Sequence, residues 1–163
     1  MAVDDSIHHS RRADGTFCLT ADQWVPSPIG EVFEFFSDAH NLEALTPAIL
    51  HFKVLTPAPI AMFPGALIDY KLRLHGIPIR WKTEITEWDP PHGFVDTQLR
   101  GPYSLWHHTH RFETEGAGTR CRDTVLYRVF GGRLIQRLFV ARDVEAIFTY
   151  RQSEMRKRFG QPA

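Results

Sequence analysis

Two histidines separated by one residue, His108 and His110, are the side chains best placed for chemistry in this sequence. Because side chains alternate across a β-strand, both imidazoles would lie on one face of a strand through residues 103–113. With a carboxylate from Asp96 or Asp123 they could bind a metal ion. They could equally form hydrogen bonds to those carboxylates inside a cavity. A bare His-x-His pair favours the second interpretation, so we predict no metal ion and no other cofactor.

A histidine paired with a carboxylate could also transfer protons to a bound carbonyl compound. In that case His108, His110 and Asp123 would be the catalytic groups, with Arg100 close by. Nucleotide hydrolysis and acyl-enzyme chemistry lack support, since the sequence has no glycine-rich phosphate loop, no nucleophile elbow and no Cys-x-x-Cys pair. Two functions stay open, ligand binding and acid–base catalysis, and of these we prefer binding.

The predicted strands place these polar groups among aromatic side chains. Alternation assigns to one inner face Tyr70, Trp81, Trp106, His108, His110, Phe112, Asp123 and Tyr127. At residues 94–100 the pattern alone does not decide which set faces inward, Asp96, Gln98 and Arg100 or Val95, Thr97 and Leu99. Each unpaired polar group in a close-packed core costs about 1–3 kcal/mol. The inner face therefore predicts polar groups that pair with one another or that line a wet cavity.

The elements that position these residues follow in the order strand, two short helices, a series of strands and a long helix. Strands are expected at residues 16–25, 51–55, 66–74, 77–88, 94–100, 103–113 and 119–130, and their short turns require antiparallel pairing. Ser27 and Pro28 start the first helix, and the second ends before Pro47. The long helix spans residues 133–159, with an apolar stripe of Leu134, Leu138, Phe139, Val144, Ile147, Phe148, Met155 and Phe159. Basic residues near its end, Arg151 among them, are expected to be solvated.

Composition and charge narrow the classes of function. A chain of 163 residues suits one domain, which we place at 16–163 after a flexible segment at 1–15 that is either frayed or adds a strand. The 19 Lys and Arg balance the 19 Asp and Glu, so the basic excess of a nucleic-acid-binding protein is missing. No apolar run is long enough to span a bilayer, and Cys18 and Cys121 show no metal-binding or redox spacing. We therefore expect a cytoplasmic protein without an integral membrane segment.

The whole pattern resembles the START-like, helix-grip superfamily, also called SRPBCC or polyketide cyclase/dehydrase-like proteins. The segments that carry the resemblance are VPSPIGEVFEFFSDAHNLEALTP, GALIDYKLRLHGIPIRWKTEI, FVDTQLRGPYSLWHHTHRFE and GGRLIQRLFVARDVEAIFTYR. The resemblance implies a seven-stranded curved antiparallel sheet around the long C-terminal helix, with the first strand paired to the last and Cys18 near Cys121. It also implies that Asp96, Gln98 and Arg100 face the cavity. The Rieske and iron-coordinating motifs of the superfamily's oxygenases are missing.

Together these observations predict binding or carriage of an apolar or amphipathic small molecule, such as a lipid, a quinone or a polyketide-like aromatic. The alternative is a polyketide cyclase or dehydratase that uses a His–Asp pair. No nucleic-acid partner is expected, and a homodimer is left open. The predicted binding residues are Tyr70, Trp81, Asp96, Gln98, Arg100, Trp106, His108, His110, Phe112, Asp123, Tyr127, Leu138, Phe139 and Phe148.

Overall fold

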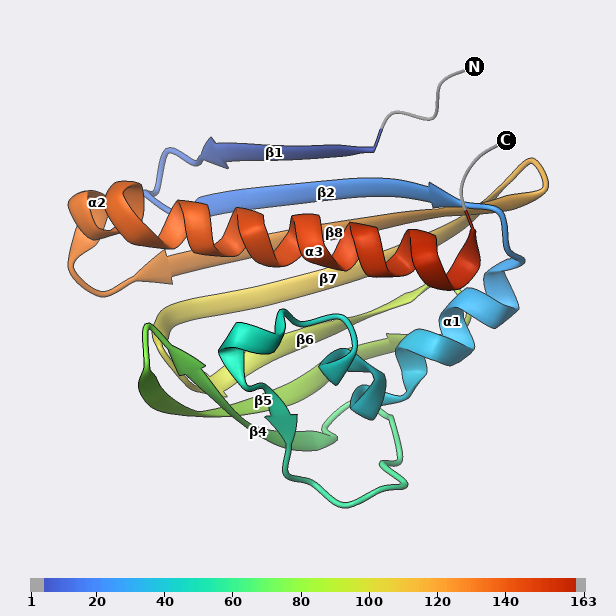
Figure 1. Ribbon diagram of the computed structural model, residues 1–163, viewed down its shortest axis with the longest axis horizontal. Helices are drawn as coiled ribbons and strands as arrows, with labels where there is room; N and C mark the ends of the chain where they lie inside the picture. Colours follow the sequence, from blue (N-terminus) through green and yellow to red (C-terminus); the bar gives the residue numbers. More distant parts are fainter. Residues whose placement is uncertain (1–4, 161–163) are drawn as a thin grey trace.

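The computed structural model describes residues 5–160, which form one antiparallel sheet curved around a long helix (Figure 1). Its eight strands lie in the order β1-β2-β8-β7-β6-β5-β4-β3. The strands are β1 (Ser6–Arg11), β2 (Phe17–Val25), β3 (Lys53–Val54), β4 (Leu67–Leu74), β5 (Ile77–Asp89), β6 (Gly93–Arg100), β7 (Tyr103–Glu115) and β8 (Gly118–Val129). The helices are α1 (Ile29–Ser37), the 3₁₀-helices η1 (Ala39–Glu43) and η2 (Ala48–Leu50), α2 (Gly132–Ile135), the π-helix η3 (Gln136–Val140) and α3 (Ala141–Phe159). This arrangement confirms the predicted α+β helix-grip architecture.

Short turns fix the pairing of the central strands. β4 and β5 are joined by His75 and Gly76, whose φ angles are 48° and 80°, and Leu74 lies opposite Ile77. Two consecutive residues with positive φ match the twist of a hairpin, which explains the tight connection. β6 to β8 continue as antiparallel neighbours, as the sequence predicts.

The long C-terminal helix runs without a break from Gly132 to Phe159 through α2, η3 and α3, which confirms the predicted helix at 133–159. It starts at Gly131, where φ is 87° and an added Cβ would lie 2.6 Å from the Cγ1 atom of Ile135. Only glycine fits this position without strain. In Figure 1 the helix lies across the concave side of the sheet, and α1 closes one end.

The start of the chain corrects the predicted number of strands. The sheet has eight strands and not seven, because residues 6–11 pair with β2 from Ser6 opposite Asp22 to Arg11 opposite Phe17. That stretch of the predicted flexible segment is therefore a strand. Its backbone satisfies the donors and acceptors that β2 would otherwise present at an open sheet edge. Residues 1–4 of the same segment lie outside the described residues.

The predicted pairing of the first long strand with the last is confirmed as β2 with β8. The two cysteines lie on these neighbouring strands but not opposite each other. Cys18 faces Leu126 and Cys121 faces Gln23, so the implied proximity is wrong in register. Both thiols are free.

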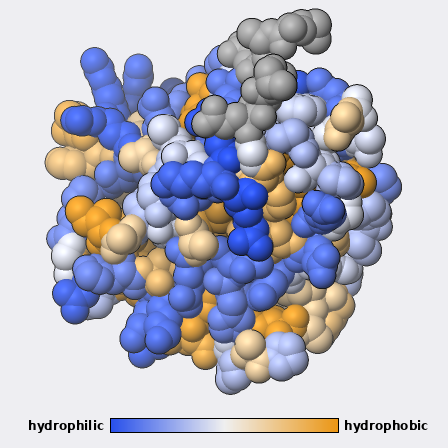
Figure 2. Space-filling view, turned by 45° about the vertical axis from the view of Figure 1, so that its right-hand side comes forward, coloured by the Kyte–Doolittle hydropathy of each residue, from blue (hydrophilic) through white to orange (hydrophobic). Residues whose placement is uncertain are grey.

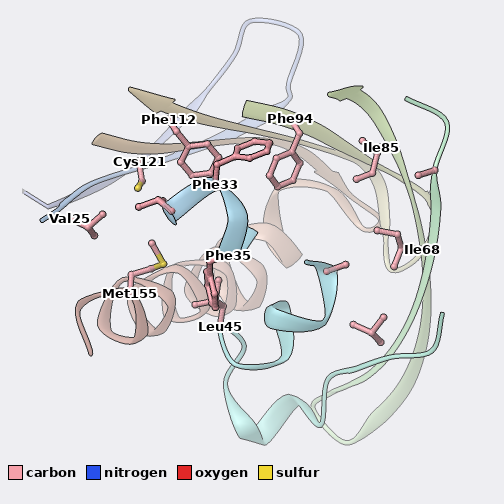
Figure 3. Close-up of a cluster of buried hydrophobic side chains, with 14 of the residues drawn as sticks. Val25, Phe33, Phe35, Leu45, Ile68, Ile85, Phe94, Phe112, Cys121 and Met155 are labelled. Carbon is pink, nitrogen blue, oxygen red and sulfur yellow. The ribbon is translucent and has the colours of Figure 1, made fainter. Parts of the chain in front are cut away.

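Two apolar clusters hold the sheet to the helices. The first joins α1 to β6, β7 and α3, with Phe33 against Phe94 and Phe112, and it includes Met155 of α3 (Figure 3). The second joins β2 and β8 to α3 and includes Leu19, Trp106, Val125, Tyr127, Val144 and Phe148. On β7 the inward side chains pass from Trp106 in the second cluster to Phe112 in the first, so His108 and His110 lie between the two.

The surface is mixed in character. On the face seen in Figure 2, hydrophilic side chains cover most of the molecule and hydrophobic ones show between them. None of the helices in the described part of the chain is long and apolar enough to cross a membrane.

Candidate functional site

Neighbouring strands bring four ionisable side chains together on the inner face of the sheet. Asp96 on β6 lies opposite His108 on β7, and His110 on β7 lies opposite Asp123 on β8. Directly opposed residues of an antiparallel pair have their side chains on the same face. The register therefore assembles all four into one group, which with Arg151 of α3 we call the inner polar cluster.

Each carboxylate of this cluster contacts both histidines. The Asp96 Oδ2 atom lies 2.8 Å from His110 Nε2 and 3.6 Å from His108 Nδ1. The Asp123 Oδ1 atom lies 2.9 Å from His108 Nε2 and 2.9 Å from His110 Nδ1. Since a carboxylate only accepts hydrogen bonds, these bonds call for a proton on Nε2 of each histidine. His110 Nδ1 lies 2.9 Å from Asp123 Oδ1 and 3.4 Å from the Arg151 Nη2 donor, so a second proton on that nitrogen would make His110 an imidazolium held by Asp123.

Arg151 completes the charge balance of the cluster from α3. Its side chain is buried, with Nε 3.6 Å from Asp123 Oδ2 and the guanidinium 5.0 Å from the ring centre of Phe36. The expectation that this arginine is solvated is wrong. It follows Val144 and Phe148 at helical spacing, and the stripe continues to the buried Met155. Its position in the helical repeat therefore predicted that Arg151 is buried, although its charge suggested that it is exposed.

The pKa values agree with this assignment of charge. Burial raises the pKa of Asp123, but the Arg151 guanidinium and the hydrogen bonds from both histidines outweigh it and hold that pKa well below its usual value. For Asp96, burial is likewise outweighed by the two histidines and Arg151, so its pKa is lowered. With His110 protonated, two carboxylates face two cations, Arg151 and His110, and the charges of the cluster balance.

The pKa values of the two histidines are shifted in opposite directions. Burial and the neighbouring charge of His110 lower the pKa of His108 despite its carboxylate partners. Burial also acts against the charged form of His110, but its hydrogen bonds to Asp123 and Asp96 prevail and raise its pKa. Opposite shifts on adjacent rings make His110 the stronger base of the pair and His108 the group that loses its proton first.

An NMR titration of the imidazole rings tests this assignment. We expect His110 to titrate above the ordinary histidine value of about 6.5 and His108 below it. If His108 held its proton to a higher pH than His110, the assignment of charge would be wrong.

A pocket of about 150 Å³ lies beside this cluster, between the sheet, α1 and α3. Four members of the cluster, Asp96, His108, His110 and Arg151, form part of its lining. Most of the remaining lining is apolar and comes from Phe35, Phe36, Leu42, Leu45, Leu50, Phe52, Met62, Ile68, Leu72, Leu74, Ile85, Phe94, Ile147 and Phe148. In Figure 3, Ile68 and Ile85 extend from the curved sheet into the interior, across from Phe35 and Leu45. The pocket therefore combines apolar walls with one hydrogen-bonding region.

Half of the predicted binding residues line this pocket. They are Tyr70, Trp81, Asp96, Trp106, His108, His110 and Phe148. Trp81 and Trp106 meet at a ring-centre distance of 5.3 Å, with their planes almost perpendicular. The pattern of β4, β5 and β7 thus located the aromatic wall.

Three other predicted residues are buried or half-buried but serve the packing around the pocket. Asp123 lies behind the histidines and orients them. Phe112 packs in the first apolar cluster against Phe36. Tyr127 accepts a hydrogen bond of 2.7 Å from Gln136 within the second cluster.

The remaining four lie away from the pocket. Gln98 donates to the backbone carbonyl of Tyr103 at 2.7 Å, and Arg100 is exposed. The bulge at the residue between them explains Arg100, which pairs with Lys82 on the outer face, whereas Gln98 lies opposite the inward Thr83 but is engaged by the Tyr103 backbone. Leu138 and Phe139 were expected in the apolar wall, but each is 51% exposed in η3.

Sequence reasoning missed the wall supplied by α1 and the segment after it. Phe35, Phe36 and Leu45 line the pocket from this side, together with Phe94 of β6. The apolar face of the first helix was visible in the sequence. The first helix is far from the strand of His108 and His110 along the chain. The sequence alone therefore did not reveal that α1 packs against β7.

The cluster also contains a set of potential metal ligands. Asp96, His108 and His110 can offer one ligand atom each, all within 4.8 Å of one another. A metal ion there would displace the protons between these histidines and Asp96. Because the present contacts already satisfy both carboxylates, we retain the prediction of no metal, which an elemental analysis of the purified protein would test.

Comparisons with known proteins agree with the fold. Protein Ms6760 from Mycobacterium smegmatis is 16% identical and superimposes with a TM-score of 0.66 over 94% of this chain and 99% of that one. The protein TTHA0849 from Thermus thermophilus gives 18% identity and 0.66, over 86% and 98%. Major latex-like protein 151 from Panax ginseng gives 12% and 0.66, over 88% and 97%. No curated protein sequence is similar enough to be recognised as a relative.

The sequence comparison with protein families is more specific. Residues 25–151 match the family described as "Polyketide cyclase / dehydrase and lipid transport". The matched range runs from the end of β2 to Arg151, so it includes every residue of the inner polar cluster. It also confirms the resemblance of the quoted segments to SRPBCC-type proteins. The chain therefore belongs to the polyketide cyclase / dehydrase and lipid transport family.

Proposed function

We propose that the protein binds and carries an apolar or amphipathic small molecule in the pocket between the sheet and α3. The observation that supports this most is the combination of an apolar lining with an electrically neutral hydrogen-bonding cluster on one side. Ligand sites are typically apolar clefts with a few polar groups that fix orientation. Family membership agrees with such a role.

The charge balance narrows the chemistry of the ligand. A charged head group would disturb a cluster in which two carboxylates already face two cations, and buried unpaired charge is costly. A neutral polar group such as a hydroxyl or carbonyl adds no charge and can share the hydrogen bonds of His108 and Asp96. We therefore favour a quinone or a polyketide-like aromatic over a lipid with a charged head group.

The volume of the pocket limits the size of the ligand. An apolar cavity of about 150 Å³ accommodates benzene, so one aromatic ring fits the pocket as it stands. A larger ligand requires movement of the wall formed by α1, η1 and η2. These three segments are helical and lie outside the hydrogen-bonded sheet.

Native mass spectrometry tests the proposal. The full chain is incubated with quinones, aromatic polyketides and neutral or charged lipids, and the mass of any retained molecule is recorded. We expect retention of neutral ringed compounds in a 1:1 complex. If no compound across this panel is retained, the carrier function is rejected.

A second candidate is a cyclase or dehydratase that acts in the same pocket. The opposite pKa shifts of His108 and His110 favour it, because acid–base catalysis needs one protonated and one unprotonated group. It predicts that His108→Gln abolishes turnover of a bound carbonyl compound while binding survives. A bound carbonyl compound that is recovered unchanged would return the assignment to a carrier. The cytoplasmic location and the lack of a cofactor remain predictions under both candidates.

A further inference from the structure

The start of the long helix exposes an unusual amount of apolar surface. Phe130 and Leu134 are 67% and 66% exposed, and Ile135, Leu138 and Phe139 are also exposed. We call these five residues the α2 patch. Contiguous apolar side chains on a protein surface commonly mark a site of interaction with another surface.

The burial pattern of this segment is the reverse of an ordinary surface helix. Its buried residue is polar, since Gln136 is 5% exposed and donates to Tyr127 Oη at 2.7 Å. Leu134 and Leu138 on either side face solvent instead. The apolar side chains of α2 and η3 therefore do not continue the stripe that α3 buries. Exposure of these apolar side chains to water is unfavourable, so their position on the surface needs another explanation.

Arginines are interleaved with the α2 patch. Arg133, Arg137 and Arg142 are exposed on the same segment, and residues 128–142 contain four Arg and no Asp or Glu. The carboxylate that follows is already engaged, because Asp143 lies 2.7 Å from His75 Nε2. The chain as a whole is balanced in charge, so this excess is local.

Two neighbouring turns repeat the same composition. The contact of His75 with Asp143 places the β4–β5 turn beside the start of α3, and Ile77 in that hairpin is 62% exposed. Tyr103 pairs with Val129, which places the β6–β7 turn next to the end of β8, and Leu99 before this turn is exposed. The exposed basic residues of these hairpins are Arg73, Arg80 and Arg100.

We propose that this end of the molecule docks on a membrane that contains anionic lipids. Apolar side chains of the α2 patch would enter the boundary between head groups and acyl chains, and the arginines around them would meet the lipid phosphates. An anionic bilayer supplies both chemistries over an area wide enough for three loops at once. The inference goes beyond carriage of a ligand, and its test needs no ligand.

Vesicle sedimentation with the full chain tests this proposal. The vesicles are phosphatidylcholine alone or phosphatidylcholine with about one third phosphatidylserine, at about 0.1 M salt. We expect binding to the anionic vesicles only, and its loss when the salt is raised to about 0.5 M. The variants Leu138→Asp and Arg133→Glu/Arg137→Glu should each weaken binding about tenfold or more. These side chains are exposed, so the melting temperature should stay unchanged.

Matched substitutions elsewhere provide the controls. Ile49→Asp changes an apolar residue that is 80% exposed, and Lys157→Glu changes a basic one at the far end of α3. Both should bind like the wild type. Failure of the wild type to bind anionic vesicles at low salt would overturn the proposal. Equal loss in the controls would overturn it too, as would a dimer in solution that Leu138→Asp dissociates.

Discussion

Replacement of Asp123 by asparagine is expected to lower the free energy of unfolding by about 3–5 kcal/mol, the range for breaking a buried ion pair. The substitution keeps the shape of the side chain but removes its charge. Arg151 and His110 then share a single carboxylate, Asp96, and one buried positive charge is left unpaired. Urea unfolding at pH 7 measures the loss.

Asp69→Asn is the matched control for this prediction. Asp69 is half-exposed and pairs with Lys82 at 3.7 Å on the outer face of the sheet, so its loss should cost less than about 1 kcal/mol. The double variant Asp123→Asn/Arg151→Met should lose less than the sum of the two single changes, since it removes both charges. Additive losses would show that the two side chains do not act as a pair.

Acid should abolish the difference between the wild type and Asp123→Asn. The pKa of Asp123 lies well below its unfolded value in the folded protein. A group with a depressed folded pKa contributes its full stability above the unfolded pKa, about 3.9, and loses it as the pH falls through the folded value. We expect the two unfolding curves to converge in that range. A difference that persists unchanged there would contradict the charged state assigned to Asp123.

Ile147→Trp is expected to abolish ligand binding, or to weaken it by at least about tenfold. Ile147 projects from α3 into the pocket, and an indole there would occupy much of the 150 Å³ that a ligand needs. The inner polar cluster is untouched by this change. Titration of a ligand identified by mass spectrometry, followed by calorimetry, gives the affinity.

The neighbouring substitution Ala146→Trp separates occupancy of the pocket from other effects of a large side chain. Ala146 is exposed on the same helix, so an indole there should leave affinity unchanged. Unfolding curves confirm that both variants are folded. Equal affinities of Ile147→Trp and the wild type would place the ligand elsewhere on the molecule.

The sequence predicted most of the sheet because strand alternation and short turns are local signals. His108 and His110 face inward as the pattern of β7 indicates, and the register then brings Asp96 and Asp123 to them. The choice between the two faces of residues 94–100 needed the fold. Asp96 faces the pocket, but the bulge between Gln98 and Arg100 turns Arg100 to the outer face and so separates it from the other two residues.

For the long helix, the sequence predicted the burial of several residues wrongly. Leu138 and Phe139 were assigned to the apolar stripe and Arg151 to solvent because of their side-chain types. At 100° per residue, however, Leu138 and Phe139 lie about 120° and 140° from the direction of the buried Val144, and both are exposed, while Arg151 lies on the buried stripe with Phe148. The carboxylate that pairs with Arg151 is Asp123 on the distant strand β8, so the sequence around Arg151 does not predict the ion pair.

The indole N–H signals of the four tryptophans test the central claim most directly. Trp81 and Trp106 line the pocket, whereas Trp24 donates to the Glu115 carbonyl and Trp88 packs against Phe33. During titration with a neutral aromatic ligand, a ¹H–¹⁵N spectrum should show saturable shifts of Trp81 and Trp106 while the signals of Trp24 and Trp88 stay in place. Shifts confined to Trp24 and Trp88, or none at all across the panel, would contradict a ligand site between the sheet and α3.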